Sequence, residues 1–174
     1  MTAQSLAVPS ASRPMLWPAL LLTAGMAVTI LTALGFQHIG NYVPCMLCLQ
    51  QRWPYYIGVP IGIVAVLSAA MNAPPAVTRT LLLLAGLAML IGGGMGVYHA
   101  GAEWKFWAGP STCATTVDAV TKNASDLLEG LNTQHGPSCT DASLRVLGLS
   151  FAGWNVVASA VLAAIAVFGA TRKA

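Results

Sequence analysis

Four long apolar segments without a charged residue constrain this chain more than any other feature of its sequence. At 1.5 Å of rise per residue, each would form a helix of roughly 30 Å, the thickness of the hydrocarbon core of a bilayer. Charged residues make up only 7% of the 174 residues, which excludes a water-soluble domain. We therefore predict an all-α membrane protein, a single domain built as a bundle of four transmembrane helices. These helices are expected at residues 15–36, 53–71, 80–98 and 149–170.

The distribution of charge predicts which helix ends face the cytoplasm. An even number of spans puts both termini on one side, and basic residues favour the cytoplasmic side. The tail 1–14, the turn around Arg79 and the C-terminal Arg172 and Lys173 carry no acid, whereas the loops 37–52 and 99–148 hold all five acids. Both termini are thus expected in the cytoplasm. The basic flanks account for the net charge of +3, so the composition implies no nucleic acid partner.

The second outer loop contains one further helical pattern. Its apolar residues recur at spacings of three, four and one, with charged residues between them. Such a segment is too short and too charged to span a bilayer, and we predict a short amphipathic helix lying on the outer membrane surface. A helix packed on a core of the loop itself is the alternative. The apolar residues are Val117, Val120, Ala124, Leu127, Leu128 and Leu131.

The reactive residues are concentrated in the stretch PCMLCLQQR, residues 44–52, where the second apolar segment begins. With Pro44 in the first helical turn, Cys45 and Cys48 would share one helix face, and Arg52 would continue it. A helix N-terminus and a guanidinium both favour the thiolate form of cysteine. The pattern indicates redox chemistry, although a Cys-x-x-Cys pair is equally typical of half a zinc site or of a structural pair.

A second pair of cysteines lies in the long outer loop. Cys113 and Cys139 each follow a Gly-Pro turn, which predicts that both are exposed. All four thiols would then face the oxidising compartment. A mobile pair can exchange disulfides with a soluble protein and then with the fixed pair at Cys45 and Cys48. The sequence has no haem or flavin motif, so a lipid-soluble quinone is inferred by elimination as the electron acceptor.

Polar residues inside the apolar segments suggest further contacts. Asn155 is predicted to form a hydrogen bond to another helix, and Gly92 with Gly96 forms a GxxxG pattern that favours close helix packing. Pro54 and Pro60 should kink the second helix. His99 stands at the outer end of the third helix, where it would either donate a hydrogen bond to a ligand at the depth of Cys48 or reach water.

The motif CMLCLQQR resembles the CxLCxxxR signature of the disulfide bond formation protein B (DsbB) family. The segments YHAGAEW, GPSTC, GPSC and GLSFAGWN are also similar to that family, and the likeness covers most of residues 37–155. Members are four-helix proteins of the bacterial inner membrane. They reoxidise a soluble periplasmic thiol oxidase of the DsbA type and pass the electrons to quinone, either ubiquinone or menaquinone.

The resemblance implies a role for each site residue. Cys113 would form the mixed disulfide with the soluble oxidase, and Cys139 would be its partner in the loop. Cys45 and Cys48 would receive the electrons, with Cys48 nearest the quinone. The remaining two implied site residues are Arg52, which would stabilise negative charge there, and His99, which would lie close to the quinone.

Two other classes of protein remain possible from the sequence. Four cysteines can bind zinc tetrahedrally, which would give one bound zinc per chain that survives oxidant. Alternatively, a disulfide could staple the loop of a non-catalytic four-helix protein, with a stabilisation of about 3 kcal/mol. The second alternative leaves the Cys-x-x-Cys motif and Arg52 without a role. Neither is the favoured interpretation, in which the chain is an enzyme and binds no metal.

Overall fold

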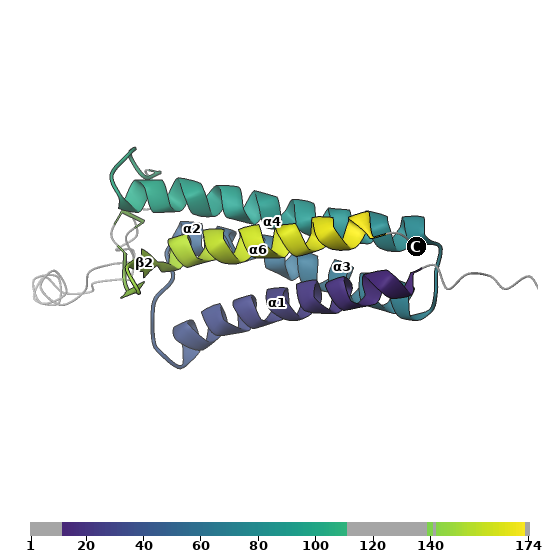
Figure 1. Ribbon diagram of the computed structural model, residues 1–174. Helices are drawn as coiled ribbons and strands as arrows, with labels where there is room; N and C mark the ends of the chain where they lie inside the picture. Colours follow the sequence, from purple (N-terminus) through teal and green to yellow (C-terminus); the bar gives the residue numbers. More distant parts are fainter. Residues whose placement is uncertain (1–11, 111–138, 141, 173–174) are drawn as a thin grey trace, which may run out of the picture.

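A computed structural model describes residues 12–110, 139–140 and 142–172. Its described part consists of helices and one small hairpin (Figure 1). The surface helix predicted within residues 117–131, Cys113 and most of the tail 1–14 lie outside the described residues. The elements are α1 (Arg13–His38), α2 (Met46–Gln50), α3 (Trp53–Ala70), α4 (Pro75–Glu103), β1 (Arg145–Val146), β2 (Leu149–Ser150) and α6 (Phe151–Thr171).

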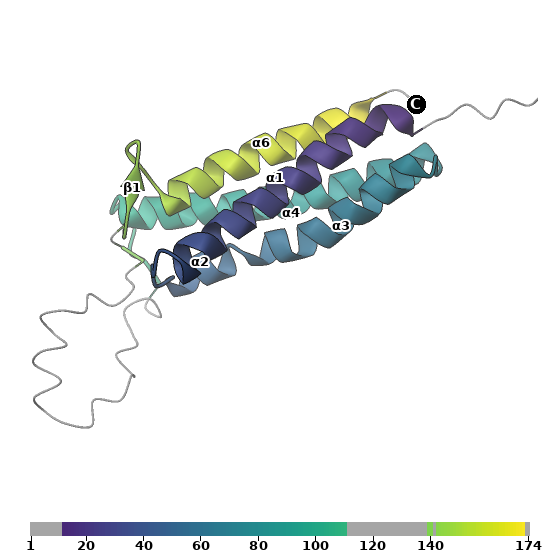
Figure 2. The same cartoon turned by 90° about the horizontal axis from the view of Figure 1, so that it is seen from below.

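The predicted bundle of four long helices is confirmed. Helices α1, α3, α4 and α6 run alongside one another (Figures 1 and 2). In the described part of the chain, four helical segments are long and apolar enough to cross a membrane, with α2 and α3 counted as one segment. The start of α1 and the end of α6 lie at the same end of the bundle. The chain is therefore a multi-pass membrane protein with its two helical termini on one side.

Small residues set the distance between the helices. A Cβ added at Gly86 of α4 would lie 2.8 Å from the Cβ of Ala166 in α6, and one at Gly96 would lie 2.9 Å from Val156 Cγ2. Such separations are too short for non-bonded carbon atoms, so glycine is required at both positions. The close packing predicted for the glycine pattern of this helix is thus observed. The buried core holds Met15, Ala19, Leu22, Met26, Ile30, Tyr55, Ala65, Leu82, Ala85, Met89, Leu162, Ala163, Ala166 and Ala170.

The second membrane segment is broken between α2 and α3. Proline lacks a backbone N–H, and its ring clashes with the carbonyl four residues earlier. Pro54, in the first turn of α3, therefore cannot continue the helical hydrogen-bond pattern to Gln50, the last residue of α2. The kink predicted at Pro54 appears as a break at Gln51 and Arg52, whereas α3 continues as a helix through Pro60. This break turns the polar side chains of Gln51 and Arg52 toward other helices.

A hairpin precedes α6 and was not predicted. Strand β1 pairs with β2 in antiparallel register, and the two residues between them, Leu147 and Gly148, have φ angles of 52° and 87°. Two central residues with positive φ match the turns that suit two-residue hairpins. The hairpin places Ser150 at the N-cap of α6, where its Oγ accepts a hydrogen bond from Gly153 N at 3.2 Å. Helix α6 consequently begins two residues after the predicted start.

Close packing at Gly86 generates a prediction about stability. Replacing Gly86 with valine places side-chain atoms against Ala166, so we expect the free energy of unfolding to fall by about 1–3 kcal/mol. Gly94→Val is the matched control, because a Cβ at Gly94 meets nothing within 4 Å. Unfolding of both variants in mixed detergent and sodium dodecyl sulfate, followed by circular dichroism, measures the difference. Equal losses in the two variants would show that α4 and α6 do not pack at Gly86.

Candidate active site

Cys45 occupies the N-cap of α2 rather than a position inside the helix. Its Sγ accepts a hydrogen bond from Cys48 N at 3.2 Å, as a serine hydroxyl does at many helix starts. The prediction that Pro44 stands in the first helical turn is wrong, because the helix begins at Met46. Both Cys45 and Cys48 are free thiols, Cys45 buried and Cys48 half-buried. The cap still brings the two residues together, as the spacing of the motif predicted.

Hydrogen bonds lower the pKa of the Cys45 thiol to about 5. The largest cause is the hydrogen bond from the side chain of Cys48. Burial raises the pKa, whereas further hydrogen bonds from the His99 side chain and the Cys48 backbone lower it. Arg52 was predicted to stabilise the thiolates. At Cys45, however, the groups that lower the pKa are Cys48 and His99 rather than Arg52. These hydrogen bonds favour the thiolate form of Cys45, the form that reacts in disulfide exchange.

His99 is buried inside the bundle. Only 3% of its surface is exposed, so the alternative in which it reaches water is wrong. Helix α4 continues to Glu103, beyond the predicted end at Tyr98, and this places His99 on an internal helix face. Its Nε2 lies 3.7 Å from Cys45 Sγ, and its Nδ1 lies 2.7 Å from Gln51 Nε2. The imidazole thus links the thiol to the polar residues of the helix break.

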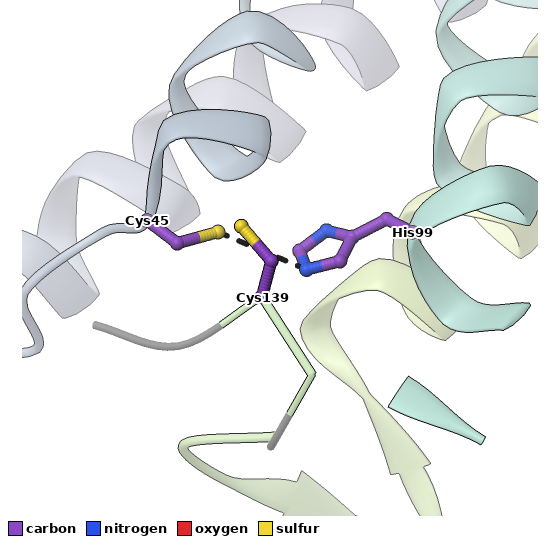
Figure 3. Close-up of side chains that lie close together, drawn as sticks. All are labelled: Cys45, His99 and Cys139. Atoms are coloured by element: carbon purple, nitrogen blue, oxygen red, sulfur yellow. Dashed lines mark hydrogen bonds between the residues drawn. The ribbon is translucent and has the colours of Figure 1, made fainter. Parts of the chain in front are cut away.

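Cys139 meets this pair from the far end of the long loop. Figure 3 shows the side chains of Cys45, His99 and Cys139 pointing toward one another. The two sulfur atoms and a ring nitrogen of His99 all lie within 4.8 Å of one another. The prediction that Cys139 is exposed is wrong, because it is 1% exposed and packs with Cys45 and Leu47. Its position brings the loop cysteine to the helix cysteine, which sequence spacing could not establish.

The convergence of these three residues also bears on the zinc alternative. Zinc binds the thiolate form of cysteine. Cys139 is disulfide-bonded in this structure, so its sulfur is not a thiolate ligand here. A free thiol held close to a disulfide-bonded sulfur is instead the arrangement from which thiol–disulfide exchange proceeds.

Arg52 contacts α1 across the break. Its Nη1 donates a hydrogen bond to Gln37 Oε1, near the end of α1. The interruption between α2 and α3 removes Arg52 from the continuous helix face predicted for it. Arg52, Cys48 and His99 nevertheless line one cavity of about 440 Å³. Most of the cavity wall is apolar and comes from α1 and α6, including Ile30, Phe36, Phe151 and Ala158.

A polar network in the cavity wall was predicted only in part. Asn155 Nδ2 donates to Gln51 Oε1 at 2.9 Å, and Tyr55 OH donates to Asn155 Oδ1 at 2.7 Å. The hydrogen bond predicted from Asn155 to another helix is therefore confirmed. Gln51 and Tyr55 were not singled out as polar partners, although the presence of Asn155 in an apolar span implied that some partner exists.

Glu103 is the second buried group that sequence reasoning missed. Its Oε1 lies 3.8 Å from His99 Nε2, and its Oε2 is buried with no hydrogen-bond partner in the described residues. The spacing of four residues on α4 places the two side chains on one helix face. That spacing, together with the position of a carboxyl group beside an apolar span, was the sequence signal that could have indicated a contact between Glu103 and His99. Glu103 was counted only as an outer-loop acid.

Comparison with known proteins places the chain in a family. The model of the family described as disulfide bond formation protein DsbB matches residues 16–169. A disulfide bond formation protein B of Saccharophagus degradans is 34% identical over 90% of this chain and 93% of its own length. One from Ralstonia nicotianae is 31% identical over 81% of this chain and 84% of its own length.

The other comparisons add little detail. An uncharacterized protein of Rickettsia prowazekii is 24% identical over 75% of this chain and 73% of its own length. No solved structure matches the chain. The family model nevertheless covers all four membrane segments and the motif with Cys45 and Cys48. The chain therefore belongs to the DsbB family and is a disulfide-forming membrane oxidoreductase.

Proposed function

We propose that this protein reoxidises a soluble periplasmic thiol oxidase of the DsbA type and passes the electrons to a membrane quinone through two cysteine pairs. The observation that carries the proposal is the convergence of the Cys45 and Cys139 sulfurs within 4.8 Å. They meet beside an apolar cavity that Cys48 and Arg52 line. The geometry thus offers both a route between the pairs and a space for an apolar acceptor.

The first half of the reaction is a thiol–disulfide exchange with the partner. A partner thiolate attacks Cys113 of a Cys113–Cys139 disulfide, and Cys139 leaves as a thiolate. The partner's second thiolate then attacks the partner's first sulfur, which is bonded to Cys113 in the mixed disulfide, and Cys113 is released as a thiolate. The partner gains a disulfide, and the loop pair gains two electrons.

The second half transfers these electrons to the fixed pair. The Cys139 thiolate attacks Cys45 of a Cys45–Cys48 disulfide, and Cys48 leaves as a thiolate. Cys113 then attacks Cys139, which restores the loop disulfide and releases Cys45. A depressed pKa of about 5 makes Cys45 a good leaving group at this step. The described state, with Cys45 and Cys48 as thiols and Cys139 disulfide-bonded, matches the product of this transfer.

The cavity suits a quinone ring. Its volume of about 440 Å³ falls in the range of small-molecule sites, and its walls are mainly apolar. A quinone accepts two electrons and two protons when it is reduced. The Cys45–Cys48 dithiol would supply both electrons and release two protons as it re-forms its disulfide, with Cys48 at the cavity wall. Arg52 would stabilise the negative charge that develops there. His99 would present a polar ring atom at the same depth.

The proposed orientation puts this site on the periplasmic side of the inner membrane. Arg79 Nε donates to the carbonyl of Ala170 at 2.7 Å, so the start of α4 and the end of α6 lie together. Arg13, at the start of α1, and Arg172 belong to the same end of the bundle. Basic residues at the ends of transmembrane helices favour the cytoplasm, which supports cytoplasmic termini and periplasmic cysteines.

The reactivity of Cys45 should depend little on pH between about pH 8 and pH 6. Because its thiolate persists until the pH falls through about 5, alkylation by iodoacetamide should be constant from about pH 8 to pH 6. Mass spectrometry of the Cys45 peptide measures the rate. In Cys48→Ala the main lowering cause is absent, so the midpoint should move upward. A wild-type rate that falls about tenfold per pH unit over this range, as an ordinary thiol requires, would contradict the low pKa.

Arg52→Ala should weaken quinone reduction selectively. Loss of a hydrogen-bonding cation is expected to reduce kcat/KM for quinone about 10- to 100-fold, from an interaction of about 1.5–3 kcal/mol. Single-turnover oxidation of the partner should stay at the wild-type rate. Arg145→Ala, which changes an exposed arginine of β1, is the control and should leave both rates unchanged. Quinone kinetics in Arg52→Ala equal to those of the control would remove the proposed role of Arg52.

Cys113→Ser should abolish exchange with the soluble partner while leaving the fixed pair competent. The variant lacks the sulfur that the partner attacks, so no mixed disulfide should form. Reduction of its Cys45–Cys48 pair by a small dithiol, followed by reoxidation with quinone, should continue. Thiol trapping in membranes with and without quinone reads out both pairs. Partner oxidation at the wild-type rate would show that Cys113 is not the entry point.

A further inference from the structure

A continuous chain of hydrogen bonds joins the backbone of α4 to the ring of His99. Asn155 Nδ2 lies 3.2 Å from the carbonyl oxygen of Gly92 and 2.9 Å from Gln51 Oε1. Gln51 Nε2 in turn lies 2.7 Å from His99 Nδ1. Tyr55 OH bonds to the other end of the Asn155 amide, at Oδ1, over 2.7 Å. The chain crosses from α4 to α6 and returns through the break between α2 and α3.

The carbonyl at one end determines the direction of every bond in this chain. A backbone carbonyl only accepts, so the Asn155 atom that faces Gly92 is the NH₂ group. The same NH₂ group faces Gln51, which must therefore present its own carbonyl oxygen, Oε1. Gln51 consequently turns its NH₂ group toward His99. An NH₂ group of an amide donates and does not accept, so the facing Nδ1 of His99 is an unprotonated acceptor.

The ring proton of His99 then resides on Nε2. This N–H faces the reactive end of the site, where Nε2 is 3.7 Å from Cys45 Sγ and 3.8 Å from Glu103 Oε1. Among the described residues, the ionisable groups that contact the ring are Cys45 from the start of α2 and Glu103 from α4 itself. The disulfide-bonded Cys139 approaches from the loop. A proton on Nδ1 would instead put two donors against each other across 2.7 Å.

We propose that Gln51 and Asn155 are positioning residues that hold His99 as the neutral Nε2–H tautomer, so that its N–H is directed at the Cys45 sulfur. A donor fixed in this way stabilises the Cys45 thiolate whenever that sulfur is the leaving group. Because the imidazole is neutral, it does so without adding a positive charge beside that of Arg52. The use of the tautomer in exchange rests on the proposed function, whereas the tautomer itself can be measured without partner or quinone.

Two neighbouring glutamines supply a matched pair of variants. Gln51→Glu replaces the donating NH₂ group with a carboxylate that only accepts, so His99 must carry a proton on Nδ1. Gln50→Glu introduces the same charge one residue earlier, at an exposed position. Gln51→Met removes the donor without adding charge and serves if the acidic variant does not fold. Asn155→Leu breaks the chain one link further from the ring.

The experiment is nitrogen NMR of the full chain in detergent micelles. His38→Gln and His135→Gln leave His99 as the single histidine, because the chain has three. With ¹⁵N-labelled histidine, Nε2 is recognised by its coupling to both carbon-bound ring hydrogens. At about pH 7, the parent chain and Gln50→Glu should carry the proton on Nε2 alone. Gln51→Glu should gain a protonated Nδ1, and Gln51→Met and Asn155→Leu should show mixed tautomers.

Two results would overturn the assignment. One is a proton on Nδ1 in the parent chain. The other is a Gln51→Glu or Gln51→Met spectrum identical to that of Gln50→Glu. Failure of the electron-transfer proposal would leave the tautomer in place, because these spectra need no turnover. A second measurement links the tautomer to chemistry: the pH midpoint for alkylation of Cys45 should move in Gln51→Met and stay constant in Gln50→Glu.

Discussion

The requirement that polar groups freed by a helix break find partners shapes the cysteine end of this protein. Hydrocarbon offers no hydrogen bonds, so a break in a membrane helix is tolerated only where other groups satisfy the freed atoms. Pro54 forces such a break, and the side chains that it redirects find partners on other helices. Gln51 bonds to Asn155 and His99, and Arg52 bonds to Gln37. The polar site is therefore built from the contacts that make the break possible.

The same requirement sets the chemistry of Cys45. Burial alone would raise the pKa of a thiol, because a thiolate is costly to remove from water. Here the Cys48 side chain supplies the main hydrogen bond, and the His99 side chain and the backbone N–H of Cys48 supply two more, so the pKa falls to about 5. Helix α2 has only five residues, so these direct bonds matter more than a helix dipole. A buried sulfur becomes reactive because its donors are already in place.

Part of this arrangement was predictable from local sequence. Length and apolarity identified all four membrane helices, Pro54 indicated the helix break, and Asn155 indicated a bond between helices. Each of these properties depends on the chemistry of a short segment. Other expectations failed because they depended on neighbours. Cys139 follows a Gly-Pro turn but is buried against Cys45, and His99 is buried because α4 runs one turn further than its apolar composition suggested.

The sequence by itself determined that the chain spans a membrane four times and that its cysteines stand at helix ends and in the long loop. Hydrophobic length and residue spacing are local quantities, so no tertiary contact is needed to read them. Only the tertiary structure decided which sulfurs meet, that Arg52 turns to α1, and that Gln51 bonds to both His99 and Asn155. These relations join residues up to about a hundred positions apart, such as Gln51 and Asn155, and only the folded chain brings such residues into contact.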